Sequence, residues 1–313
     1  MYSENKMISV IIPTYNRLSS LKDMIRSLEG QSLDVGEFEV IVVDDGSNDG
    51  TYKWLSEYKG RLNLRYVKHH TNRGTATTRN DGIRSAKGDI IVFLDDDIKA
   101  DRDLLFTYLT AHQREDSVFV GNVIYEKNAR ERALLRYLST RGVHKGKRDF
   151  TCFITQNASV KRNDAIDAGL FNDSISCFFQ GEDIEFAYKL SLLSKRFIYI
   201  KEAVAYHSHT VNLQKVLLDA ERFGKNLLPL LIDKHPVFRE TFRLYLLDPV
   251  HLLKEPLSLS LQKLIVRFSL HRGIYNLIRR LTTLFNGFFV PFIFFDYLIF
   301  YNRTKWMSQR QSL

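Results

Sequence analysis

Three groups of carboxylates in this 313-residue sequence are candidates for chemistry. They are Asp44 with Asp45 after the run IVV, the triplet Asp95, Asp96 and Asp97 after IIVFL, and Glu182 with Asp183 after FFQG. Holding carboxylates near one another costs free energy unless a cation neutralises them, so acids that gather at one edge of a sheet indicate a metal ion or a cationic partner. Any single pair could instead cap a helix. Three groups at one edge make capping a poor explanation.

The acidic triplet at residues 95–97 offers hard oxygen ligands that suit Mg²⁺ or Mn²⁺, ions that usually keep coordination positions open for substrate phosphates. A cation there would neutralise the charge that develops on a diphosphate leaving group. The turn DDGSNDG begins at Asp44, and its carboxylates could accept hydrogen bonds from a base or a ribose hydroxyl. Arg79, in the run NRGTATTRN, could reach a phosphate or form a structural ion pair with an acid.

The segments that must position these groups alternate between short β-branched runs and helix-period stretches, which is the pattern of a parallel α/β sheet. We predict strands over 8–13, 40–43, 62–67 and 90–94, and helices over 18–28, 52–58, 75–86, 130–139 and 183–194. Two further apolar runs cover 197–200 and 203–206. The polar clusters follow the carboxyl ends of strands, which is where open α/β sheets bind ligands.

The composition excludes several classes of protein. Only two cysteines, Cys152 and Cys177, are present, which excludes a disulfide scaffold and a cysteine-rich zinc module. The N-terminal apolar run is shorter than a signal peptide requires, so we expect a cytoplasmic protein. The formal net charge is +9, and after residue 250 nine Lys or Arg stand against two acids among aliphatic and aromatic runs. This combination favours an anionic membrane surface and argues against nucleic acid as the partner.

The apolar segment 284–301, LFNGFFVPFIFFDYLIFY, is borderline for a membrane-spanning helix, which needs about 20 residues. Asn286, Pro291 and Asp296 interrupt it. We favour a helix in the membrane interface or a re-entrant hairpin; the alternative is a helical subdomain that packs on the sheet or on a partner subunit. We therefore predict a sheet domain over 1–212 and a helical region over 213–313, which would hold the protein peripherally on the inner face of the cell membrane.

Five segments, read in this order and spacing, resemble the family 2 glycosyltransferases with the GT-A fold. They are SVIIPTYNR, VVDDGSNDGT, NRGTATTRN, FLDDDI and GEDIEFAYKL, and the resemblance covers roughly Ser9 to His209. It implies a Rossmann-like, mostly parallel central sheet flanked by helices, followed here by a helical, basic and aromatic C-terminal extension. It also implies a nucleotide-diphosphate sugar as the donor and Mn²⁺ or Mg²⁺ as the cofactor.

The resemblance also implies roles for individual residues. The nucleotide-binding set is Pro13, Thr14, Tyr15, Asn16, Arg17, Asp44, Asp45, Arg79, Asp95 and Asp96, with Asp44 or Asp45 near the base and ribose. The metal ligands are Asp97, Asp95 and one histidine, either His207 or His209, with a preference for His207. The choice of direct ligand among the three aspartates stays open. The general base is Asp183, and Glu182 either binds acceptor hydroxyls or orients its loop.

A general base is needed because a sugar hydroxyl has a pKa far above neutral pH and attacks well only if its proton leaves as the new bond forms. Direct displacement from the face opposite the nucleotide would invert the anomeric centre. Asp183 lies at the predicted start of a helix, and the helix N-terminus would keep its carboxylate ionised. The alternative role for Asp183 is a simple helix cap.

The sequence therefore predicts an inverting, metal-dependent transferase that moves a single sugar to a hydroxyl of a glycan or lipid-linked acceptor in surface polysaccharide synthesis. The Gln-x-x-Arg-Trp motif of processive synthases is absent from the sequence. Two alternatives stay open. One is a catalytically silent subunit of the same fold that binds a nucleotide sugar or a partner; the other is a Mg²⁺-dependent aspartyl phosphotransferase, because FLDDDI contains Asp-x-Asp. The phosphotransferase requires a nucleophilic Asp on the first strand, which ends here in Pro-Thr-Tyr.

Overall fold

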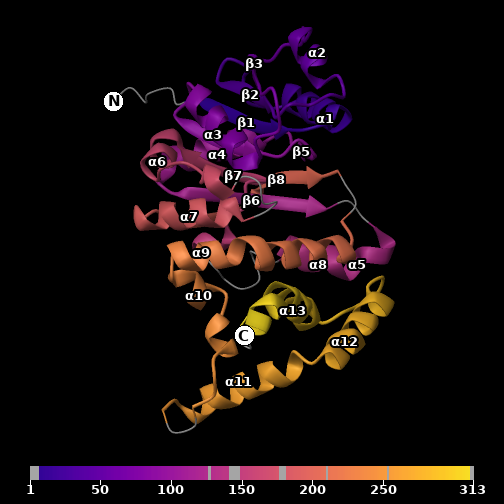
Figure 1. The fold of residues 1–313 in the computed structure, drawn as a ribbon. Helices are drawn as coiled ribbons and strands as arrows, with labels where there is room; N and C mark the ends of the chain where they lie inside the picture. The colour runs from indigo at the N-terminus through magenta and orange to yellow at the C-terminus, as the bar shows by residue number, and fades with distance from the viewer. Residues whose placement is uncertain are drawn as a thin grey trace. The chain divides into compact units, whose positions relative to one another are not determined.

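The computed structural model describes residues 7–125, 128–140, 149–175, 181–208, 211–251 and 254–310. These residues form two compact units (Figure 1). The first, called here the sheet unit, lies within residues 1–126, 139–177 and 181–210. The second, the helical unit, lies within residues 127–138, 178–180 and 211–313. The helical unit therefore includes two short stretches of chain that interrupt the sheet unit in sequence.

The sheet unit contains an eight-stranded sheet in the order β3-β2-β1-β4-β7-β6-β8-β5. Its strands are β1 (Ile8–Thr14), β2 (Phe38–Asp44), β3 (Leu64–Lys68), β4 (Ile90–Leu94), β5 (Ile98–Ala100), β6 (Val118–Tyr125), β7 (Asn157–Lys161) and β8 (Phe197–His207). Strands β3, β2, β1 and β4 are parallel, as are β6 and β8, whereas β7 runs antiparallel to both of its neighbours and β5 to β8. The predicted α/β class with a mostly parallel sheet is confirmed.

Side chains alternate across the strands and bury two apolar layers, one on each face of the sheet. In β1, Ile8, Val10 and Ile12 belong to one layer and Ile11 belongs to the other. The helices of this unit are α1 (Leu18–Glu29), α2 (Thr51–Ser56), α3 (Thr75–Ser85), α4 (Leu104–Arg114), α6 (Arg162–Asp167) and α7 (Glu182–Leu192). Helices α1 and α4 pack in the first layer, and α3, α6 and α7 pack in the second.

The helical unit is built from seven described α-helices. They are α5 (Arg132–Thr140), which begins in this unit, α8 (Leu213–Arg222), α9 (Leu228–Lys234), α10 (Val237–Thr241), α11 (Leu257–Ser269), α12 (Arg272–Phe285) and α13 (Phe292–Arg310). Of these, α5, α8, α12 and α13 contribute to a separate apolar core. A π-helical turn at Phe223–Leu227 joins α8 to α9. Leu134 of α5, Leu217 of α8 and Phe295 with Leu298 of α13 lie together in the core.

The apolar segment 284–301 does not form one continuous helix, so the first of the two favoured possibilities, a helix in the membrane interface, is wrong for the segment as a whole. Helix α12 ends at Phe285 and α13 begins at Phe292. Between them, the buried Asn286 accepts a hydrogen bond from the backbone N–H of Leu134 (2.9 Å) and donates one to Glu131 (2.5 Å). Helix α13 therefore packs inside the helical unit. Among the described helices, none combines the length and the apolar character that a membrane crossing requires.

Candidate active site

The candidate site lies where the chain reverses its direction of travel across the sheet. From β1 the chain proceeds outward to β2 and β3 and then returns to β4 on the other side of β1. Ligands bind at such a switch point in open α/β sheets because the loops after neighbouring strands diverge there. Thr14 at the end of β1 donates a hydrogen bond to Asp96 after β4 (2.8 Å), which ties the two strand ends together.

The loops after β1 and β2 are held to one another by short polar contacts. The backbone N–H of Asn16 donates to the Ser47 hydroxyl, and the Asn16 side chain accepts from the N–H of Asn48, both at 2.8 Å. Asn16 adopts a left-handed backbone conformation with φ of 52°, which asparagine tolerates better than most residues. Pro13 is the penultimate residue of β1, and Tyr15 is left exposed beside these loops.

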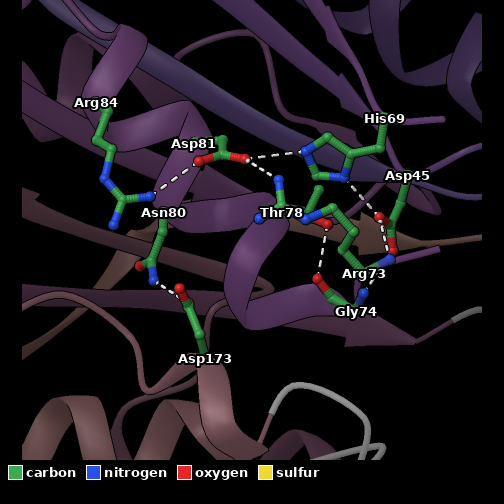
Figure 2. Close-up of polar contacts among 9 residues, drawn as sticks. All are labelled: Asp45, His69, Arg73, Gly74, Thr78, Asn80, Asp81, Arg84 and Asp173. Atoms are coloured by element: carbon green, nitrogen blue, oxygen red, sulfur yellow. Dashed lines mark hydrogen bonds and ion pairs between the residues drawn. The ribbon is translucent and has the colours of Figure 1, made fainter. Parts of the chain in front are cut away.

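The two neighbouring aspartates Asp44 and Asp45 have different environments. Asp45 accepts hydrogen bonds from His69 Nδ1 (2.7 Å) and from the backbone N–H groups of Arg73 (2.8 Å) and Gly74 (2.9 Å). This set fixes the turn that leads into α3 (Figure 2). Asp44 is fully buried and uses one carboxylate oxygen to accept from the N–H of Ser47 (2.9 Å). Its Oδ2 has no hydrogen-bond partner among the described residues.

A histidine that the sequence analysis did not single out supports this turn. Buried His69 lies between two carboxylates, with Nε2 at 3.0 Å from Asp81 of α3 and Nδ1 on Asp45 (Figure 2). Asp81 also accepts from Arg73 (3.2 Å) and Arg84 (2.9 Å). The feature of the sequence that could have indicated His69 is its position directly after β3, at the same sheet edge as the acids.

The acidic triplet at residues 95–97 faces two different groups. Arg17 Nη1 contacts Asp96 Oδ1 at 3.0 Å and Asp97 Oδ2 at 2.8 Å. Pairing of β5 with β8 sets Ile98 opposite His207, and His207 Nε2 lies 3.8 Å from Asp97 Oδ2. The second oxygen of Asp97 is buried and has no hydrogen-bond partner in the described part of the chain.

The predicted metal ligands are brought together only in part. Asp97 and His207 are neighbours, whereas Asp95 is bound by Arg79. Within the residues that the structure describes, no group of three or more His, Cys, Asp or Glu side chains is arranged to hold a metal ion. His209 lies outside the described residues. The metal-ligand assignment therefore stays a prediction.

Arg79 links the acidic triplet to the acids of α7. Its side chain is buried, and it contacts Asp95 through Nη2 (3.0 Å) and Glu182 through Nη1 (2.5 Å). Its guanidinium also lies 5.7 Å from the centre of the Phe171 ring. The sequence left two roles open for Arg79, a contact with a phosphate and an ion pair with an acid. This structure contains the ion pair. The arrangement sets the start of α7, where Glu182 and Asp183 follow Gly181, directly beside the end of β4.

The site carries more negative than positive charge, because the five acids at residues 95–97, 182 and 183 face two arginines. Burial raises the pKa of Asp95, and it raises the pKa of Asp96 to about 6. Burial and the nearby Glu182 carboxylate raise the pKa of Asp183 to about 7. The Ile184 N–H that donates to Asp183 (2.8 Å) lowers this pKa but is the weaker influence. The expected ionising effect of the helix N-terminus is therefore outweighed by burial.

Comparison with known proteins identifies the class to which this fold and site belong. Residues 9–169 match the family described as Glycosyl transferase family 2, and this match covers just over half of the chain. The chain therefore belongs to glycosyltransferase family 2, as its five motifs predict.

Individual relatives are similar over parts of their length. An uncharacterized glycosyltransferase, YfnE of Bacillus subtilis, is 40% identical over 119 residues, which are 38% of this chain and 30% of YfnE. The validoxylamine A glucosyltransferase of Streptomyces hygroscopicus subsp. jinggangensis is 27% identical in an alignment of 267 positions, which covers 74% of this chain and 61% of that enzyme. The matched regions thus span less than two thirds of either relative.

Two solved structures have a similar fold. Staphylococcus aureus TarS 1-349 in complex with UDP has a TM-score of 0.55 and 20% identity, covering 98% of this chain and 92% of that one. The mannosyltransferase PcManGT from Pyrobaculum calidifontis, in complex with GDP-Man and Mn²⁺, has a TM-score of 0.60 and 20% identity, covering 97% and 88%. These likenesses confirm the predicted GT-A fold.

Proposed function

We propose that this chain transfers a single sugar, with inversion, from a nucleotide-diphosphate donor to a hydroxyl of a glycan or lipid-linked acceptor in surface polysaccharide synthesis. The observation that carries the proposal is the contact of Arg79 with both Asp95 and Glu182, because it sets the acidic triplet beside Asp183. Such a site offers the acidic triplet to bind the cation of the donor and Asp183 to take the proton of the acceptor hydroxyl. Relatives named as a glucosyltransferase and as a poly(ribitol-phosphate) beta-N-acetylglucosaminyltransferase support a sugar-transfer reaction.

The nucleotide of the donor would lie against the loops after β1 and β2. The exposed Tyr15 ring offers an apolar face for a base, and the second oxygen of Asp44 is an acceptor without a partner among the described residues. A buried acceptor of this kind is costly unless a ligand donor satisfies it. Between the two aspartates we therefore assign Asp44 to the nucleotide and Asp45 to the turn before α3.

Paired substitutions test this assignment. Asp44→Asn is expected to weaken nucleotide binding by about tenfold or more, because it replaces a charged acceptor of a ligand hydrogen bond, while the melting temperature changes little. Asp45→Asn is expected to lower the melting temperature, because Asp45 accepts three hydrogen bonds within the chain. Isothermal titration with UDP and GDP, together with thermal unfolding, separates the two effects. The reverse pattern would show that the roles are exchanged.

A divalent cation suits this site on chemical grounds. The acids outnumber the arginines, and the unpartnered Asp97 oxygen together with His207 would hold Mn²⁺ or Mg²⁺, with Asp95 nearby as the third predicted ligand. Such ions usually complete their coordination with water and substrate phosphates, so few protein ligands are required. When bound, the ion would offset negative charge on the departing diphosphate.

Residues at the start of α7 would act on the acceptor hydroxyl. Asp183, whose pKa is raised to about 7, is suited to accept a proton near neutral pH. The acceptor hydroxyl would transfer its proton to the Asp183 carboxylate while its oxygen forms a bond to the anomeric carbon. The bond from that carbon to the diphosphate oxygen breaks on the opposite face, which inverts the configuration. Glu182, buried and bound to Arg79, would position Asp183 or the acceptor.

A thermal-shift panel tests donor and cation binding together. UDP or GDP with Mn²⁺ is expected to stabilise the protein by about 3 kcal/mol when present at roughly a hundred times its dissociation constant, and less without Mn²⁺. Asp97→Asn should remove most of the Mn²⁺-dependent part. The matched control Asp167→Asn, at an exposed position in α6, should keep it. Stabilisation by neither nucleotide would contradict the proposal, and nucleotide binding without turnover of a labelled donor would favour the catalytically silent subunit.

The proposal extends to where the enzyme works. A lipid-linked acceptor would place the reaction at a membrane, and the basic and aromatic region 213–313 would keep the protein peripherally on the inner face of the cell membrane. The charge distribution supports this part, because nine Lys or Arg stand against two acids after residue 250.

A further inference from the structure

Helix α11 carries its apolar side chains on the outside. Leu257, Leu261, Leu264, Ile265 and Phe268 are exposed. Phe268 is 74% exposed, whereas the residues that α11 buries are Ser260 and Lys263. The exposed residues recur at spacings of three and four, so they form one stripe along the helix. This is the reverse of the pattern of a helix that packs its apolar stripe on a protein core.

The inverted orientation of α11 is held by specific polar contacts. Buried Lys263 forms an ion pair with Glu255 and donates to the backbone carbonyl of Pro249 (3.3 Å). Ser260 donates to the same Glu255 carboxylate (2.9 Å). A rotation of α11 about its axis would break these buried contacts. The polar contacts therefore determine that the apolar stripe faces solvent.

The next helix and the loop after it, which follow α11 in the chain (Figure 1), also carry exposed apolar side chains. Leu277, Leu284, Phe285, Phe288, Phe289 and Ile293 are exposed. Phe288 is 80% exposed, while the polar residues Thr282 and Asn286 are buried. Together with the stripe of α11, these residues are called here the apolar face. Exposed apolar side chains gathered in such numbers on consecutive elements indicate a site of contact with protein or membrane.

Basic residues accompany the apolar face. Residues 254–293 contain six Lys or Arg and a single acid, Glu255, which is already paired with Lys263. Arg267, Arg272, Arg279 and Arg280 are exposed. A pocket of about 770 Å³ in the helical unit is lined by Arg130, Arg132 and Arg279 together with apolar residues that include Leu284 and Phe288. Positively charged and apolar side chains therefore line the same pocket.

We infer that the apolar face of α11, α12 and the α12–α13 loop is a membrane-docking surface for an anionic phospholipid bilayer. Exposed aromatic and aliphatic side chains enter the boundary between headgroups and acyl chains, and arginines beside them attract anionic headgroups. The inference deepens the proposed function by assigning the membrane contact to this face, whereas α13 packs inside the helical unit. The excess of basic residues favours this occupant over a second copy of the chain, since two such faces would repel one another.

Vesicle flotation with the full chain tests the docking surface. We expect the protein to float with vesicles that mix phosphatidylglycerol into phosphatidylcholine, much less with phosphatidylcholine alone, and less at high salt. Arg279→Glu with Arg280→Glu should weaken binding to the mixed vesicles by about thirtyfold or more, because each basic residue near an anionic surface contributes substantially to binding. Phe268→Ser with Phe288→Ser should weaken it by about tenfold or more.

Matched variants elsewhere control for general effects of charge and apolarity. Phe106→Ser removes an aromatic side chain that is 54% exposed on α4 of the sheet unit. Lys59→Glu with Lys201→Glu reverses two exposed basic residues of that unit. Both should bind vesicles like the unaltered protein. Nucleotide-dependent thermal stabilisation should be the same in all variants, so loss of docking is distinguishable from failure of the proposed transferase function.

Three outcomes would overturn the inference. The first is flotation that is equal with every vesicle composition. The second is flotation of the apolar-face variants that equals that of the unaltered chain. The third is a stable oligomer in light scattering that the Phe268→Ser and Phe288→Ser changes dissociate, with no vesicle binding. The last result would assign the apolar face to a second copy of the chain.

Discussion

Replacing Asp183 with Asn is expected to lower the rate of sugar transfer by about 10²–10⁴-fold while donor binding stays nearly unchanged. The substitution keeps the size of the side chain but removes its ability to take the proton of the acceptor hydroxyl. Single-turnover transfer from a labelled donor gives the rate, and titration with the donor gives the affinity. Transfer within about tenfold of the unaltered enzyme would reject Asp183 as the base.

The same residue sets the expected pH dependence. A base works in its deprotonated form, and the pKa of Asp183 is raised to about 7. The value of kcat/KM should therefore fall as the pH drops below about 7 and level off above it, because kcat/KM reports groups of the free enzyme. The residual activity of Asp183→Asn should lack this acidic limb. Asp167→Asn, an exposed aspartate of α6, should keep both the rate and the limb.

Replacing Arg79 with Met is expected to destabilise the fold by about 3–5 kcal/mol, the cost of leaving buried charges without their partner. Arg79 is buried between Asp95 and Glu182, so its loss leaves two acids facing one another in a region of low polarity. Urea denaturation followed by circular dichroism measures the free energy of unfolding. Adding Glu182→Gln to the Arg79→Met variant should recover part of the loss, because one of the stranded charges is then neutral.

Arg84 on the same helix supplies the control for this experiment. It pairs with Asp81 at 2.9 Å, but its side chain is half exposed, and exposed ion pairs contribute little to stability. Arg84→Met should therefore change the free energy of unfolding by less than about 1 kcal/mol. Equal effects at both positions would show that the Arg79 pairs have no special structural role.

Most of the parallel half of the sheet could be predicted from the sequence because β1, β2 and β4 each contain a continuous apolar run, whereas β3 reads LRYVK and is only partly buried. The strands β1 and β4 are buried on both faces and read as ISVIIPT and IIVFL. The strands in the middle of the chain were not predicted: β6 reads VFVGNVIY, in which Gly121 and Asn122 interrupt the apolar run. Strand β5 has three residues and pairs with β8, about a hundred positions later, so no local pattern indicates it. Strand β8 continues through Lys201 and Glu202, which divide its sequence into two apparent runs.

The candidate site was predictable by residue type and less so by arrangement. The acid clusters follow from their positions at strand and helix ends, whereas Arg79 lies within α3 and was indicated by the run NRGTATTRN. The separate environments of Asp44 and Asp45 do not, because they depend on His69 and on backbone groups before α3. The pKa of Asp183 was also beyond sequence reasoning, since burial and the nearby Glu182 are properties of the folded chain.

Arg17 gives the acidic triplet an internal counterion, because one guanidinium nitrogen contacts both Asp96 and Asp97. Arrival of a divalent ion would thus be an exchange in which one positive charge replaces another. If the proposed ion binds there, we expect a chelator to stop sugar transfer without lowering the melting temperature, because Arg17 would then pair with the two carboxylates again.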